Sequence, residues 1–217
     1  MKSAGNDVIA LDAINVQRTN DSRFYSKFVT PPELELYHPQ LPFETFVWLL
    51  WSVKEAAYKY LQRYNAGLIF SPAKLIVQTV YRPDNFKPTP FISTWENDNT
   101  NEQFVTGTIT DGTNHLYFRS KIHTNVLATV VDEDESFANT CWGIHQIEQM
   151  DSKSQSAGVR KFALNRLRTI IKQDGLSIGK SKDGYPTILN LIGPMYMALS
   201  FAHHENFVGY SFDRGPF

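Results

Sequence analysis

The chain of 217 residues carries 21 basic and 22 acidic residues, for a net charge of −1, and 42% of it is hydrophobic. This length supports one ordinary domain or two small subdomains, and the balanced charge gives no reason to expect a nucleic-acid partner. The single cysteine, Cys141, cannot form an internal disulfide. No apolar run approaches the roughly 18–20 residues of a membrane span, so we expect a cytoplasmic protein with no membrane partner.

The first part of the chain predicts a strand, a long helix and an antiparallel sheet. A short strand is expected over residues 8–14, and Thr30 followed by Glu33 is typical of a helix start. Between Phe43 and Tyr64 apolar residues recur at helical spacing, which predicts a long helix with one buried face. Further strands are expected over residues 75–81, 91–95, 104–110, 116–122 and 126–131.

The second part predicts a similar unit. A polar linker leads to a helix ending near residue 171, and paired strands are expected over residues 197–200 and 207–212. Each part also carries a Ser-x-x-His segment, which ends at His123 in the first and His203 in the second. These similarities indicate two copies of one unit, although chance similarity between two short hairpins remains an equal alternative.

We therefore expect an α+β fold built as a pseudo-dimer of two similar subdomains, residues 1–135 and 136–217. Each subdomain would pack a long helix on a small antiparallel sheet, and the active site would lie at their interface.

Several charged residues have two interpretations. Glu55 and Lys59 lie one helical turn apart, so they form either an exposed ion pair or the metal ligand and phosphate clamp of an active site. Asp12 lies in an apolar strand, so it is expected near the strand end or beside a partner. His203 alone would be a turn histidine.

Taken together, these segments resemble the 4′-phosphopantetheinyl transferase superfamily. The family's aromatic-x-x-Lys-Glu-Ala-x-x-Lys helix motif is similar to Trp51-Ser52-Val53-Lys54-Glu55-Ala56-Ala57-Tyr58-Lys59, and its Gly-x-Asp motif to Ala10-Leu11-Asp12, 43 residues before Glu55. Its Gly-Lys/Arg-Pro and Ser-x-Ser/Thr-His segments are similar to Gly184-Tyr185-Pro186 and Ser200-Phe201-Ala202-His203. The departures are Ala10, Tyr185 and Ala202 within these motifs, and Ile14 where one branch has a third acidic ligand.

The order of the motifs also differs from one branch of the family. The single-chain pseudo-dimeric branch has the Gly-x-Pro and His half first, whereas here it comes second. The chain thus resembles a circular permutation of that arrangement, which predicts that residues 1 and 217 lie close together.

The resemblance implies a Mg²⁺-dependent enzyme that transfers 4′-phosphopantetheine from coenzyme A to a serine of an acyl or peptidyl carrier protein, releasing 3′,5′-ADP. A monomer is expected. Asp12 and Glu55 would bind the metal, Asp12, Glu55 and Lys59 would be catalytic, and Arg18 would face the carrier protein. The residues expected to contact coenzyme A are Lys59, Arg160, Lys180, Lys182, Gly184, Pro186, Ser200 and His203.

Three questions stay open at this level. Either Glu55 or a metal-bound water would accept the serine proton, and either His203 or His123 would contact phosphate. The substitutions at Tyr185 and Ala202 also leave an alternative, a degenerate member that binds coenzyme A or a carrier protein without transfer.

Overall fold

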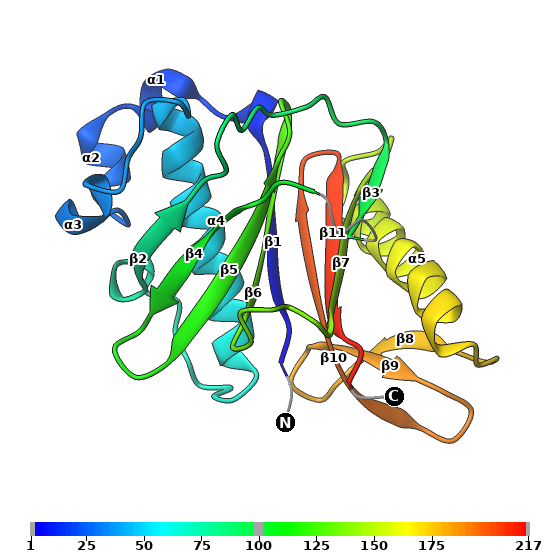
Figure 1. Ribbon diagram of the computed structural model, residues 1–217. Coiled ribbons are helices and arrows are strands. Elements are labelled where there is room, and N and C mark those ends of the chain that lie inside the picture. The colour runs from blue at the N-terminus through cyan, green and yellow to red at the C-terminus, as the bar shows by residue number, and fades with distance from the viewer. Residues whose placement is uncertain (1–2, 98–101, 216–217) are drawn as a thin grey trace.

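The computed structural model describes residues 3–97 and 102–215 and consists of two antiparallel sheets, each with one long helix against it (Figure 1). Helix α4 (Phe43–Gln62) covers the first sheet. That sheet has the order β1 (Gly5–Ala10), β6 (Val126–Asp132), β5 (His115–Ile122), β4 (Val105–Thr110) and β2 (Ile76–Tyr81). The α+β class predicted from the sequence is confirmed.

The second sheet lies beside helix α5 (Ser152–Ile171). Its order is β3 (Thr94–Glu96), β7 (Thr140–Gln146), β11 (Phe207–Asp213), β10 (Pro194–His204), β9 (Pro186–Leu189) and β8 (Ser177–Lys180). Short helical segments complete the described chain: Leu11–Ala13, α1 (Val16–Thr19), α2 (Ser22–Tyr25), α3 (Pro31–Leu34) and Pro72–Lys74.

The two units share one connectivity. When β1 is matched with β7, α4 with α5, and β2, β4, β5 and β6 with β8 to β11 in turn, the strand orders β1-β6-β5-β4-β2 and β7-β11-β10-β9-β8 coincide. One element departs from the scheme: β3, which lies within residues 1–135, pairs with the outer edge of β7 in the second sheet. The first part of the chain therefore contributes a strand to the second unit.

Most predicted elements are present, with two informative differences. The expected strand over residues 8–14 begins three residues earlier and ends at Ala10, after which Leu11–Ala13 form a 3₁₀ turn. Strands β7, β8 and β9 were not predicted. Strand β7 is buried over its first five residues and contains Gly143, so it lacks the alternation of a half-exposed strand.

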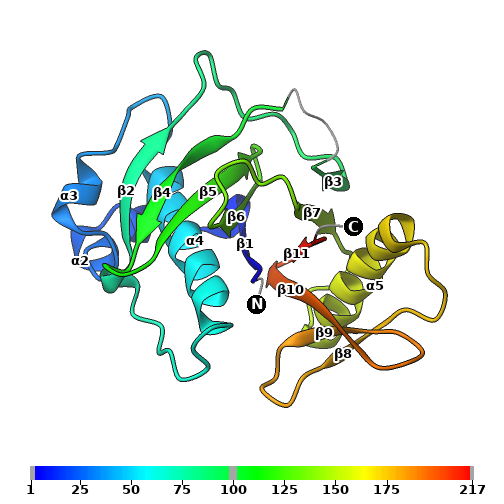
Figure 2. The same cartoon turned by 60° about the horizontal axis from the view of Figure 1, so that its bottom comes forward.

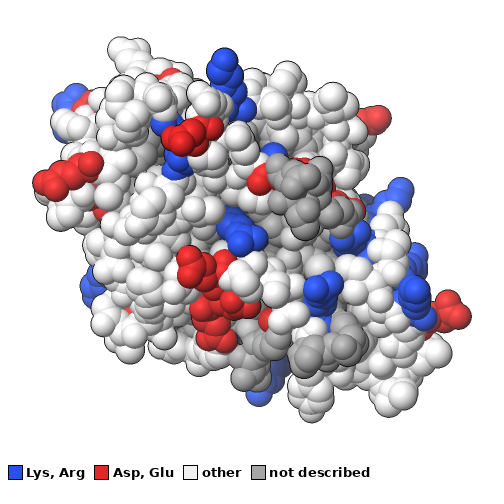
Figure 3. Space-filling view, in the orientation of Figure 1, with Lys and Arg blue, Asp and Glu red and all other residues white. Residues whose placement is uncertain are grey.

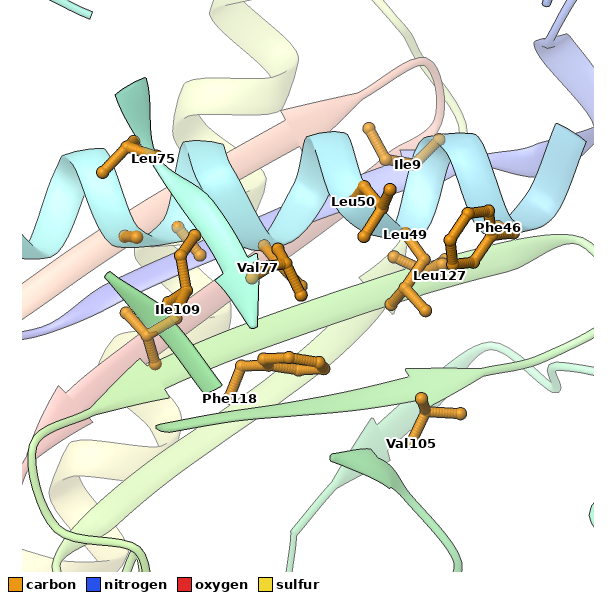
Figure 4. Packing of buried hydrophobic residues seen from close by; sticks show 14 of the residues in the cluster. Ile9, Phe46, Leu49, Leu50, Leu75, Val77, Val105, Ile109, Phe118 and Leu127 are labelled. Carbon is orange, nitrogen blue, oxygen red and sulfur yellow. The ribbon is translucent and has the colours of Figure 1, made fainter. Parts of the chain in front are cut away.

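The core of the first unit lies between α4 and its sheet. Phe46, Leu49 and Leu50 on the helix face Val77, Phe118 and other strand residues across an apolar layer (Figure 4). These side chains are almost fully buried, and burying one such side chain contributes roughly 1.5–3 kcal/mol. Burial of this apolar face fixes the rotation of α4 about its axis. That rotation decides where the polar face of the helix points.

The units meet where β1 lies beside β10 and β11, between the two sheets (Figures 1 and 2). The Ala10 backbone N–H donates to Nδ1 of His204 over 2.9 Å. Farther along the junction, the Tyr185 hydroxyl donates to the Gln62 carbonyl oxygen over 3.1 Å. The prediction that residues 1 and 217 lie close together concerns residues outside the described chain. Strand β1 begins at the same end of the molecule at which β11 ends.

Gly5 sets the distance between β1 and α4. A Cβ at Gly5 would lie 2.2 Å from the Ala56 carbonyl oxygen and 2.8 Å from the Tyr60 Cβ, so only glycine permits this approach. We expect Gly5→Ala to lower the free energy of unfolding by about 1–3 kcal/mol, measured by urea denaturation. Gly67→Ala is the matched control, because the nearest atom to its added Cβ would be 3.5 Å away. Equal effects of the two substitutions would contradict this packing.

Charge is distributed unevenly over the surface. On the face shown in Figure 3, acidic side chains gather below the centre, whereas lysine and arginine side chains follow the side formed by α5. Glu133, Asp134 and Glu135 are exposed in the loop between β6 and β7. Among the helices of the described chain, none is both long and apolar enough to cross a membrane.

Candidate active site

Three charged side chains converge where β1 passes the C-terminal half of α4. The Lys59 Nζ lies 3.2 Å from Glu55 Oε1 and 3.4 Å from Asp7 Oδ1, and it also donates to the Asn6 carbonyl oxygen over 3.0 Å. Glu55 and Lys59 are partly exposed, whereas Asp7 is buried. Two carboxylates thus converge on one cation at the edge of solvent.

Local structure explains this geometry. The four-residue spacing of Glu55 and Lys59 places both on one face of α4. The indole Nε1 of Trp51, one turn earlier, donates to Glu55 Oε2 over 3.1 Å and holds that carboxylate in place. Asp7 reaches the helix because Gly5, two residues before it in β1, allows close approach.

Burial and charge oppose each other at Asp7. Burial raises the pKa of this carboxyl, the Lys59 ammonium lowers it and Glu55 raises it further, and the result is a pKa of about 7. Burial also lowers the pKa of Lys59, but Asp7 and Glu55 outweigh it, so that pKa lies above its usual value. The buried Asp7 Oδ2 has no hydrogen-bond partner. Ser52 is close enough to lower the pKa of Asp7, but its hydroxyl donates to Thr129 Oγ1 and leaves Oδ2 unpaired.

This raised pKa predicts a pH dependence of stability. An unfolded aspartate titrates near 3.8 and folded Asp7 near 7, so between these values the folded state binds more protons and the free energy of unfolding falls as pH rises. Asp7→Asn removes this loss. We expect its stability relative to the unmodified protein to increase from about pH 5 to pH 8 in urea denaturation. A difference that does not change with pH would mean that Asp7 titrates normally.

His203 is an exposed residue of the second unit, on the strand that lies beside β1. It lies near the end of β10, and burial lowers its pKa, Lys59 lowers it further and Glu55 opposes them. Lys59 and Glu55 are thus among the charged groups that act on this exposed side chain. The neighbouring His204 instead bonds to the backbone of β1, which holds this end of β10 against the first unit.

Asp12 lies outside the cluster. Because β1 ends at Ala10, Asp12 is on the 3₁₀ turn that follows, where it is exposed. Within the described chain it forms no hydrogen bond or ion pair with Glu55 or Lys59. The carboxylate beside these two residues is that of Asp7, in Gly5-Asn6-Asp7, which has the glycine that Ala10-Leu11-Asp12 lacks.

The other expected coenzyme A residues lie at different distances from the junction. Gly184, with a φ of 86°, and Pro186 flank Tyr185, whose hydroxyl reaches the end of α4. Ser200 is buried in β10. Lys180 and Lys182 are exposed at the end of β8 and in the turn after it.

Two arginines have structural contacts instead. The Arg160 Nη1 donates to the Ile178 carbonyl oxygen over 3.2 Å, which ties α5 to β8. Arg18 is exposed on α1, with its guanidinium carbon 4.7 Å from the centroid of the Phe24 ring. Neither belongs to the Asp7 cluster.

His123 occupies the corresponding hairpin of the first unit. It is buried, its Nδ1 lies 3.1 Å from the Thr89 carbonyl oxygen, and burial lowers its pKa. Its ring packs on Phe91 instead of facing the α4 residues. Of the two histidines, His203 is the one whose pKa is affected by Lys59 and Glu55.

Sequence reasoning also missed the role of the lysine before Glu55. The Lys54 Nζ is completely buried, 2.8 Å from the Glu33 carboxylate and 2.6 Å from the Phe28 carbonyl oxygen. Burial lowers the pKa of Lys54, and Glu33 opposes that effect. The signal was present in the helix start: Glu33 also accepts from the Thr30 N–H, as a capping box requires. The pair anchors α3 to α4 behind the site.

The side chains that are present limit which metal ions could bind at this site. In the described ranges no group of three or more His, Cys, Asp or Glu side chains is arranged to hold a metal ion. Asp7 and Glu55 supply two carboxylates, which suits Mg²⁺ because it keeps several waters and uses substrate phosphates as ligands. A cavity of about 940 Å³ lies elsewhere, between β7 and α5, and Asp7, Glu55 and Lys59 do not line it. The junction is the candidate site because of its charged side chains, Asp7, Glu55 and Lys59, and not because of the size of a cavity.

The fold and the site together define an α+β protein of two helix-on-sheet units with a charged cluster where they meet. A family model described as the 4′-phosphopantetheinyl transferase superfamily matches residues 3–130, more than half of the chain. The chain belongs to this superfamily, whose members are in general transferases that use coenzyme A. The match includes Asp7, Glu55 and Lys59 and ends before His203. No curated protein and no solved structure matches the chain.

Proposed function

We propose that the protein transfers the 4′-phosphopantetheine arm of coenzyme A to a serine hydroxyl of an acyl or peptidyl carrier protein. The serine oxygen would form a bond to the phosphorus that bears the arm, the bond from that phosphorus to the leaving 3′,5′-ADP would break, and the serine proton would pass to a base. The observation that carries this proposal is the convergence of Asp7, Glu55 and Lys59 where β1 lies beside β10, the strand that carries His203.

The residues have separate tasks in this proposal. Asp7 and Glu55 would hold Mg²⁺. When bound, this ion would neutralise negative charge on the pyrophosphate. The fit rests on the unpaired Asp7 Oδ2 and on a site that already holds a cation, the Lys59 ammonium, between two carboxylates. Lys59 and His203 would bind phosphate oxygens and orient the pyrophosphate. Such positioning is a large part of the rate in phosphoryl-type transfers.

We further propose that the two units are copies of one ancestral fold, in the reverse order of the single-chain pseudo-dimeric branch. Their shared strand order supports this. The cleft between them would hold coenzyme A, with Gly184, Pro186 and Ser200 on the second side, Lys180 and Lys182 near its phosphates, and Arg18 toward the carrier protein. The protein would act as a cytoplasmic monomer, because one chain supplies both halves of the site.

One observation favours the alternative, a protein that binds coenzyme A or a carrier without transfer. Tyr185 replaces the basic residue of the Gly-x-Pro segment, and the Arg63 guanidinium carbon lies 4.6 Å from the centroid of its ring. The segment thus packs against the end of α4, and Tyr185 brings no charge of its own to a phosphate.

An intact-mass assay separates the two functions. The protein is incubated with coenzyme A, Mg²⁺ and a panel of apo carrier proteins, and we expect one carrier to gain about 340 Da, the mass of the transferred arm. No gain on any carrier, with coenzyme A still bound in calorimetry, would favour the binding protein.

A further inference from the structure

A second cavity, unrelated to the junction, lies between the start of α4 and the first sheet. It has a volume of about 260 Å³. Phe46 on α4 and Val105 on β4 lie toward the same end of the apolar core in Figure 4. Glu55 is nine residues after Phe46, or about 13 Å farther along the helix axis. The apolar residues that line the cavity are Leu36, Leu41, Phe46, Val80 and Val105.

Arg82 brings a partly exposed guanidinium to this cavity. It follows directly after β2, which ends at Tyr81, and both Arg82 and Val80 line the cavity. The Arg82 Nε is buried and has no hydrogen-bond partner. Across residues 3–97 and 102–215, Arg82 forms no ion pair, not even with nearby Asp84. Because the Arg82 side chain is partly exposed, its guanidinium can supply donors to a ligand that brings an acceptor to the cavity.

His38 is the second polar residue in the lining. The Gln40 N–H donates to its Nδ1 over 3.4 Å, so a neutral ring carries its proton on Nε2 and presents a donor there. No aspartate or glutamate lines the cavity. Both polar residues therefore offer donors, and nothing in the lining competes for the positive charge of Arg82.

We propose that this cavity binds a small organic monocarboxylate, with its carboxylate on Arg82 and its hydrocarbon body among Leu41, Phe46 and Val105. An arginine fork pairs with a carboxylate through two parallel hydrogen bonds. A singly charged group suits apolar walls better than a phosphate dianion, because burying more charge costs more. The volume equals that of about nine liquid water molecules, which suits a body of about six to eight carbons.

Calorimetric titration of the full chain tests this site with hexanoate and octanoate. Acetate supplies the charge without the body, and 1-hexanol supplies the body without the charge. We expect one site with a Kd on the order of 0.1–1 mM for the better carboxylate, at least about tenfold tighter than for acetate or 1-hexanol.

Two variants locate the binding. Arg82→Met keeps an unbranched side chain but removes the hydrogen-bond donors. It should therefore weaken the binding of hexanoate at least about tenfold and leave the binding of 1-hexanol unchanged. Arg23→Met, at an exposed arginine, is the matched control and should bind as the unmodified protein does. Circular dichroism confirms that both variants fold. The proposal is overturned if hexanoate and octanoate do not bind, if Arg82→Met binds them unchanged, or if inorganic phosphate binds more tightly than either.

Discussion

Replacing Glu55 by glutamine is expected to reduce transfer to a carrier protein by at least about 100-fold, while the protein stays folded. The variant keeps the size of the side chain and a hydrogen bond from Trp51, but it removes the negative charge that faces Lys59 and the proposed cation. Loss of one electrostatic group at a transition state typically costs this much or more. The rate is measured by intact mass of the carrier over time.

Glu44→Gln is the matched control for this prediction. Glu44 lies on the same helix in its first turn, far from Lys59, and should retain full activity. If Glu55→Gln kept the activity of Glu44→Gln, Glu55 would have no part in the chemistry.

Removing Glu33 is expected to give the largest loss of stability. Glu33→Ala leaves the Lys54 ammonium without its counter-ion in a fully buried place, and it also frees the Val77 N–H, which donates to Glu33 over 2.8 Å. Such a change costs about 3–5 kcal/mol of the free energy of unfolding, measured in urea. The exposed pair of Arg23 and Asp21 supplies the control, since Arg23→Ala should change stability little.

The double variant Glu33→Leu with Lys54→Met tests the cause. If the unpaired charge is responsible, this variant is more stable than Glu33→Ala, because no charge is left buried. A double variant that is no better than the single one would assign the loss to the capping box and the Val77 hydrogen bond instead.

The helix and its charged face were predictable because a 20-residue amphipathic pattern is a strong local signal. Phe43–Gln62 agrees with the expected residues 43–64 to within two residues. The same spacing put Glu55 and Lys59 on one face. It could not tell an exposed pair from a site, since that depends on β1 and β10, which are distant in sequence.

The shift from Asp12 to Asp7 has a physical cause that the sequence only hints at. An apolar run from Val8 suggested a strand with Asp12 near its end, whereas the strand runs from Gly5 to Ala10, and Gly5 lets it approach Ala56 closely. The hint was a glycine followed two residues later by an aspartate. Sequence alone likewise could not choose between His203 and His123, because their burial and their charged neighbours depend on residues that are distant in sequence.

The central claim is that Asp7, and not Asp12, forms the catalytic site with Glu55. Its most direct test compares Asp7→Asn with Asp12→Asn in the carrier mass assay, both at saturating coenzyme A and Mg²⁺. We expect Asp7→Asn to lose at least about 100-fold in rate and Asp12→Asn to stay close to the unmodified protein. Full activity of Asp7→Asn, with loss of activity in Asp12→Asn, would contradict the account.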